Sequence, residues 1–126
     1  MRPTILTVDD SKALRLFVQQ ALAPFDCEAG ESNNGYNAFF AIERARPDLI
    51  LLDVAMPVMD GREMLSRLKS EPELQSIPVI MLTSPADHAA VPQLVKLGAS
   101  GILQKPFSAA ALIGKIRTVL ALKATA

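Results

Sequence analysis

Short apolar runs, separated by longer amphipathic stretches, are the dominant pattern of this sequence. Such runs, bounded by turn-forming or charged residues, are typical of strands that are buried on both faces of a sheet. The clearest is Leu49-Ile50-Leu51-Leu52, which contains no polar residue and stops at Asp53. The pattern predicts strands at residues 4–8, 49–52, 77–82 and 101–103, with a weaker one at 27–30.

Helical periodicity fills the intervals between these runs. Apolar residues recur at spacings of three and four, which indicates helices with one buried face. Ser11 and Ser108 are suited to cap the first and last helices, and the last is expected to reach Leu120. Pro92 lacks the backbone donor that a helix interior needs, so the fourth helix is expected to start late, near Val91, or to be kinked.

Strand and helix therefore alternate five times. Short strands separated by helices require parallel βαβ crossovers, which give a doubly wound sheet with helices on both faces. The predicted fold is a flavodoxin-like α/β domain, with a five-stranded parallel sheet and five helices in three layers. The 126 residues are expected to form a single domain with a core at about 4–121. The Ala-rich residues 122–126 are expected to be a frayed tail or the start of a linker.

Charge and composition exclude several classes of function. The 13 basic and 13 acidic side chains cancel, so nothing favours nucleic acid or an anionic membrane as a partner. No apolar run approaches the length of a membrane span, and the N-terminus has no signal-peptide pattern. Cys27 is the sole cysteine, which rules out an internal disulfide and allows a reducing compartment. A cytoplasmic protein is expected.

Polar side chains follow four of the predicted strands. Asp9 and Asp10 follow the first, Asp53 the third and Thr83 the fourth, while Lys105 comes shortly after the fifth. The carboxyl ends of parallel strands meet at one edge of the sheet, where ligands bind in open α/β folds. The sequence therefore predicts that three carboxylates, a hydroxyl and an ammonium group converge there.

This set of side chains suits phosphoryl transfer assisted by a metal ion. Clustered carboxylates repel one another, and Mg²⁺, or Mn²⁺ as a substitute, relieves that repulsion through oxygen ligands. Asp53 is the expected nucleophile, because carboxylates are known to form aspartyl phosphates. Lys105 is positioned to pair with the developing charge, and Thr83 to donate to a phosphoryl oxygen.

Four motifs in this order resemble the receiver domain of two-component response regulators, of which the chemotaxis proteins are an example. They are VDDS at 8–11, LLDVAMPVMDG at 51–61, MLTS at 81–84 and LGASGILQKPF at 97–107. The resemblance covers residues 5–120, nearly the whole chain, and implies the strand order 2-1-3-4-5. The roles it implies are a phosphoacceptor at Asp53, Mg²⁺ ligands at Asp9, Asp10, Asp53 and the carbonyl of Ala55, a switch hydroxyl at Thr83, a phosphate-binding Lys105 and a cis peptide before Pro106.

A family member of this kind is a signalling switch rather than an enzyme. The resemblance implies a histidine kinase or a histidine phosphotransfer protein as phosphodonor and an unknown downstream protein as target. Phosphorylation would change partner affinity through the face formed by the fourth helix, the fifth strand and the last helix. The chain is expected to be a monomer or a weak dimer.

Two positions depart from the family pattern, and three other functions remain as alternatives. Ile102 stands where the family often has an aromatic switch residue, and Pro92 lies on the same expected output face. These departures leave open a degenerate receiver that works without phosphate. A phosphohydrolase with an aspartate nucleophile is disfavoured, because it usually needs a second carboxylate where Ala55 stands. A flavin-binding module is disfavoured because Asp9 and Asp10 would repel the flavin phosphate.

Overall fold

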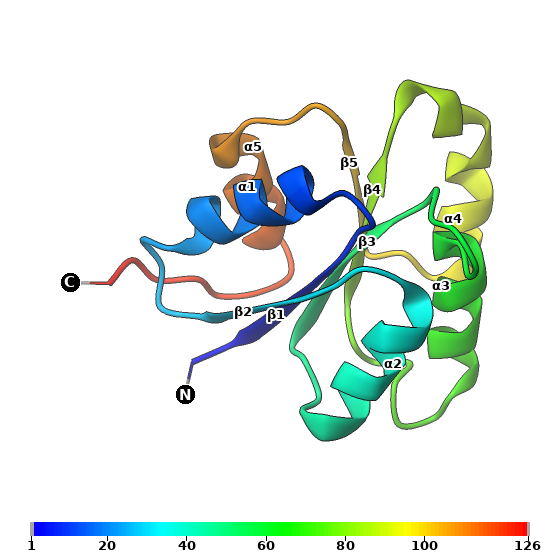
Figure 1. Ribbon diagram of the computed structural model, residues 1–126, viewed down its shortest axis with the longest axis horizontal. Helices are drawn as coiled ribbons and strands as arrows, with labels where there is room; N and C mark the ends of the chain where they lie inside the picture. The colour runs from blue at the N-terminus through cyan, green and yellow to red at the C-terminus, as the bar shows by residue number, and fades with distance from the viewer. Residues whose placement is uncertain (1, 126) are drawn as a thin grey trace.

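A five-stranded parallel sheet forms the centre of the protein (Figure 1), in a computed structural model that describes residues 2–125. The strand order is β2-β1-β3-β4-β5, which confirms both the fold class and the strand order expected from the sequence. The strands are β1 Thr4–Val8, β2 Glu28–Ser32, β3 Leu49–Asp53, β4 Val79–Thr83 and β5 Gly101–Gln104.

Helices cover both faces of the sheet and complete the three layers (Figure 1). Two of them, α1 and α5, lie on one face, and α2, α3 and α4 lie on the other. Their bounds are α1 Lys12–Leu22, α2 Gly35–Arg44, α3 Gly61–Ser70, α4 Val91–Leu97 and α5 Ala109–Ile116, with a 3₁₀ helix at Pro85–Ala90 before α4. Ser11 and Ser108 cap α1 and α5 as predicted, each accepting a backbone N–H three residues on.

The central strand explains why the longest apolar run has no polar interruption. Every residue of β3 is buried, because both faces of the sheet are covered. Leu49 and Leu51 pack towards α1 and α5, whereas Ile50 and Leu52 pack towards α2, α3 and α4. Each such side chain contributes about 2 kcal/mol of hydrophobic stabilisation. The strand therefore holds Asp53 on a rigid support.

The start and end of α4 follow from two residues. Pro92 is the second residue of the helix, where a missing N–H costs nothing because first-turn donors have no intrahelical partner. The late start at Val91 is thus confirmed. Gly98 ends the helix with φ 109°, a left-handed conformation that favours glycine. None of the helices within residues 2–125 is long and apolar enough to cross a membrane.

The C-terminal segment differs from the expectation of a frayed tail. Helix α5 ends at Ile116, earlier than the predicted Leu120, and the chain then folds back against the α1–β2 connection. Asp26 donates its backbone N–H to the Lys123 carbonyl (2.7 Å), and Leu122 is 5% exposed within the α1/α5 core cluster. For residues 122–125 the frayed-tail prediction is wrong, because a buried leucine and main-chain hydrogen bonds hold the segment.

Leu122→Ala is expected to lower the free energy of unfolding by about 2 kcal/mol, near the low end for buried leucines because the tail is peripheral. Urea denaturation measures this loss. The same variant is expected to speed hydrogen exchange at the Asp26 amide, which loses its partner when the tail detaches. The exposed Lys123→Ala serves as control. Equal stability of both variants and the wild type would contradict a docked tail.

Candidate functional site

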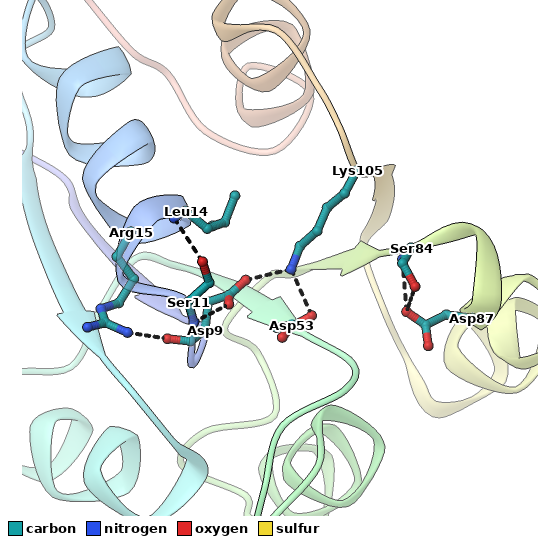
Figure 2. A network of polar contacts seen from close by, with 8 residues as sticks. All are labelled: Asp9, Ser11, Leu14, Arg15, Asp53, Ser84, Asp87 and Lys105. Carbon is teal, nitrogen blue, oxygen red and sulfur yellow. Dashed lines mark hydrogen bonds and ion pairs between the residues drawn. The ribbon is translucent and has the colours of Figure 1, made fainter.

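The predicted site residues lie at the carboxyl edge of the sheet, where Figure 2 shows Asp9, Asp53 and Lys105. Asp9 follows β1, Asp53 ends β3, and Thr83 ends β4. The β4–β5 pairing sets Thr83 opposite Gln104. The next residue, Lys105, donates its backbone N–H to the Thr83 carbonyl at 2.6 Å. Segments that are far apart in the sequence are thus joined at one edge by the strand register.

The ammonium group of Lys105 connects two carboxylates. Its Nζ lies 2.8 Å from Asp9 Oδ2 and 3.0 Å from Asp53 Oδ1 (Figure 2). Asp9 is 0% exposed and Asp53 5% exposed, so both charges lie where solvent screens them little. Asp9 is held further by the backbone N–H of Ser11, which donates to its Oδ1 at 2.9 Å. One cation is therefore shared between two buried acids.

The pKa values of both Asp53 and Lys105 are displaced by this arrangement. Burial is the main reason why the pKa of Asp53 rises to about 6, and the negative charge of Asp9 raises it further, against the opposing effect of Lys105. Burial alone would lower the pKa of Lys105, but its hydrogen bonds to Asp9 and Asp53 outweigh burial and raise it. Asp53 is therefore largely ionised at neutral pH, and Lys105 is protonated.

A third carboxylate completes an acidic cluster. Carboxylate oxygens of Asp9, Asp10 and Asp53 all lie within 4.8 Å of one another, with Asp10 on the exposed side. Oxygen ligands at this spacing are the donor set that hard divalent cations such as Mg²⁺ accept. Ala55 lies two residues beyond β3 and is exposed, outside the contacts that join Asp9, Asp53 and Lys105.

The loop after β3 is closed tightly against the strand that carries Asp53. Gly61 donates its N–H to the Val54 carbonyl at 2.8 Å, and a Cβ at this glycine would collide with the carbonyl oxygen of Asp53. Asp60 caps α3 by accepting the Glu63 N–H. These contacts explain the Asp-Gly pair at the end of the loop.

The same loop contains a strained turn at Val58. This residue has φ 72°, and the Met59 N–H donates to the Pro57 carbonyl at 2.9 Å across it. An i to i+2 hydrogen bond around a positive φ defines a γ-turn that is unfavourable for a β-branched residue. Val58 is 79% exposed, so burial does not offset the strain.

Val58→Gly is expected to raise the free energy of unfolding by about 1 kcal/mol, because glycine accepts a positive φ and only its greater chain entropy opposes the gain. Urea denaturation provides the measurement. Val58→Ala is the matched control, since it removes the exposed methyl groups but keeps the Cβ that causes the strain. A glycine variant no more stable than the alanine variant would contradict strain at this turn.

The remaining predicted residues lie at different distances from the cluster. Thr83 is 3% exposed and joins Lys105 only through its backbone carbonyl. Ile102 is partly buried against the core on the side of α2, α3 and α4. Pro92 is exposed in the first turn of α4. The peptide bond between Lys105 and Pro106 is cis.

Comparison with known proteins identifies the family. The sequence matches the family model described as "Response regulator receiver domain" over residues 5–117. The chain belongs to the response regulator receiver family. Receiver domains are phosphoacceptor signalling domains of two-component systems, generally not enzymes in the ordinary sense.

Individual relatives of this receiver domain agree with the assignment. It is 37% identical over 117 residues to the phosphate regulon transcriptional regulatory protein PhoB of Pseudomonas aeruginosa, a match that covers 93% of this chain and 51% of PhoB. It is 30% identical to the hybrid signal transduction histidine kinase D of Dictyostelium discoideum, covering 97% of this chain and 8% of that protein. The chain therefore spans about half, or much less, of the length of these curated relatives.

A solved receiver structure has the same fold along its whole length. The chemotaxis protein CheY4 of Vibrio cholerae superposes with a TM-score of 0.87 and 31% identity, covering 95% of this chain and 100% of that chain. The family identified from the sequence and the fold seen in the structure therefore agree for the chain that carries the acidic cluster.

Proposed function

We propose that this receiver domain is a phosphorylation-dependent switch in which Asp53 accepts a phosphoryl group. The observation that carries the proposal is the Lys105 ammonium group shared between Asp53 and Asp9 at 3.0 and 2.8 Å. Lys105 opposes the rise of the Asp53 pKa, which at about 6 leaves the carboxylate largely ionised at neutral pH beside a compensating cation. Support also comes from Asp10, whose carboxylate lies within 4.8 Å of the other two.

In the proposed reaction, a carboxylate oxygen of Asp53 attacks the phosphorus of a phosphohistidine. The oxygen–phosphorus bond forms as the phosphorus–nitrogen bond breaks, and the departing histidine nitrogen takes up a proton. Lys105 pairs with the charge that gathers on the phosphoryl oxygens. Asp9, Asp10, Asp53 and the Ala55 carbonyl would hold Mg²⁺ or Mn²⁺, which when bound would neutralise the acidic cluster and the phosphoryl charge.

The output of the proposed switch depends on the coupling of β4 to Lys105. The Thr83 carbonyl accepts the Lys105 N–H, so a movement of Lys105 towards a phosphoryl group is transmitted to the end of β4. The Thr83 hydroxyl then donates to a phosphoryl oxygen, and the α4/β5/α5 face, with Ile102 and Pro92, changes its affinity for a downstream protein. The expected donor is a histidine kinase or a phosphotransfer protein in the cytoplasm.

Intact mass spectrometry after incubation with acetyl phosphate and Mg²⁺ tests the proposal. The wild type is expected to gain one phosphoryl group, and Asp53→Ala none. The exposed Asp26→Ala keeps every site residue and is expected to react like the wild type. Addition of EDTA is expected to suppress the adduct. Equal adducts in the wild type and Asp53→Ala would overturn the assignment of Asp53, and a wild type without adduct would favour a receiver that works without phosphate.

A further inference from the structure

Arg15 is a charged residue of the site region that the proposed phosphorylation does not use. It lies on the first turns of α1, and its side chain is only 14% exposed. Its Nη1 donates to the backbone carbonyl of Asp9 at 2.6 Å, and its Nε donates to Glu31 Oε1 of β2 at 2.7 Å. Figure 2 shows the guanidinium on the opposite side of Asp9 from Lys105.

The carbonyl that Arg15 holds belongs to the peptide unit between Asp9 and Asp10. The orientation of this unit sets the direction in which the chain leaves Asp9 and therefore the place of the Asp10 carboxylate. The side chain of Asp9 is fixed independently, by Ser11 N–H and Lys105. Within residues 2–125 the Asp10 carboxylate accepts no hydrogen bond, so its position depends on its backbone.

The guanidinium is itself fixed from β2. Glu31 binds its Nε, and Gln19 supports Glu31 with a hydrogen bond of 3.4 Å to Oε2 while it donates to the Ala29 carbonyl at 2.9 Å. The planar fork of arginine can hold a carboxylate and a carbonyl at once, which the single ammonium group of lysine does less well. Hydrogen bonds thus connect the edge strand β2, through Arg15, to the backbone between Asp9 and Asp10.

We propose that Arg15 is a positioning residue for the acidic cluster. It orients the Asp9–Asp10 peptide so that the Asp10 carboxylate is preorganised beside Asp9 and Asp53 for a divalent cation. This inference rests on the proposed function, because it assigns Arg15 to the cation site that phosphorylation would use. Residues that orient ligands in this way typically change metal affinity 10- to 100-fold when they are replaced.

The sign of the effect distinguishes positioning from simple electrostatics. Removing a positive charge beside three carboxylates strengthens the attraction of a cation, so electrostatics alone predicts tighter Mg²⁺ binding in Arg15→Gln. Loss of positioning predicts weaker binding. A purely structural ion pair between Arg15 and Glu31 predicts lower stability with unchanged Mg²⁺ affinity.

Titration with MgCl₂ alone, by calorimetry and by the NMR shifts of the Asp10 and Asp53 amides, tests the inference. Arg15→Gln is expected to raise the Kd for Mg²⁺ about tenfold. Arg15→Lys keeps the charge but loses the fork, and is expected to raise it about threefold. Arg44→Gln removes an exposed arginine of α2 and is expected to leave the Kd within about twofold of wild type. Circular dichroism checks that each variant is folded.

The possible outcomes separate the role of Arg15 from the proposed function. An unchanged or lower Kd in Arg15→Gln, with wild-type protein binding Mg²⁺, overturns the role of Arg15 and leaves the proposed function intact. Wild-type protein that neither binds Mg²⁺ nor forms the phosphoryl adduct overturns the proposed function, and the role of Arg15 falls with it. If Arg15→Gln does not fold, Arg15→Lys becomes the deciding variant, since an unchanged Kd there overturns the role of Arg15.

Discussion

Lys105→Met is expected to lower the free energy of unfolding by about 3–5 kcal/mol at neutral pH in EDTA, the cost of removing one partner from a buried ion pair. The ammonium group lies within 3.0 Å of both Asp9 and Asp53, and both carboxylates are buried. Without it, two adjacent negative charges face each other in a region of low dielectric constant. Methionine fills the same space, so that the loss reflects charge rather than volume.

The destabilisation of Lys105→Met is expected to shrink at mildly acidic pH, because protonation of one carboxylate removes the repulsion. Urea denaturation in EDTA at neutral and at mildly acidic pH measures both values. Lys96→Met, on the exposed side of α4, controls for the general effect of replacing lysine by methionine and is expected to change stability by less than about 0.5 kcal/mol. A loss of the same size at both pH values would show that the lysine acts through packing instead.

The convergence of the site could be predicted from the sequence because two general rules are enough to derive it. Apolar runs that alternate with helices give a parallel sheet, and parallel strands bring their carboxyl ends to one edge. Asp9, Asp53 and Thr83 follow such runs directly, so their sequence positions fix their place in the fold. The late start of α4 was predictable for a similar reason, since Pro92 restricts where a helix can begin.

The contacts within the site could not be derived in this way. They depend on side-chain conformations and on pairs of residues that no local pattern connects. Lys105 reaches Asp9 across 96 positions of the chain, and Arg15 reaches Glu31 across 16. Nothing in the sequence around Arg15 predicts its contacts either. An arginine on the exposed side of a helix usually faces solvent. Its role is visible only once the carbonyl of Asp9 is placed beside it.

The C-terminal segment shows another limit of the sequence pattern. Val119 and Leu120 continue the helical spacing of apolar residues in α5, which predicts a helix up to Leu120. The same apolar positions also fit a chain that leaves the helix after Ile116 and turns back. The structure selects the turn because Arg117 donates to the Leu122 carbonyl at 3.0 Å and lies over the Phe25 ring at 5.2 Å. Tertiary contacts of this kind override local helical preference. From the sequence alone, an alanine-rich C-terminal segment is therefore expected to fray, because the surface against which it packs is not evident there.

Asp53→Asn is expected to raise the free energy of unfolding in EDTA by up to about 3 kcal/mol at neutral pH, the equivalent of a pKa that rises from near 4 to about 6. The folded state holds the Asp53 proton more tightly than the unfolded state does. Titration of Asp53 therefore lowers wild-type stability as pH rises from near 4 to about 6, and it causes no further change above about 6. Asparagine has the same shape and no proton to lose, so the variant lacks this fall.

Urea denaturation of wild type and Asp53→Asn across that pH interval measures the difference, with Asp26→Asn as the surface control. The gap between the two proteins is expected to widen as pH rises and to level off above about 6. Lys105→Met should cost less in the Asp53→Asn background, because a single buried carboxylate then remains beside the missing ammonium group. A pH-independent gap would contradict the raised pKa of Asp53, and full additivity of the two substitutions would contradict a cation shared between Asp9 and Asp53. The carboxylate that is proposed to accept phosphate is thus expected to destabilise the unliganded fold, so structural need does not account for an aspartate at this position.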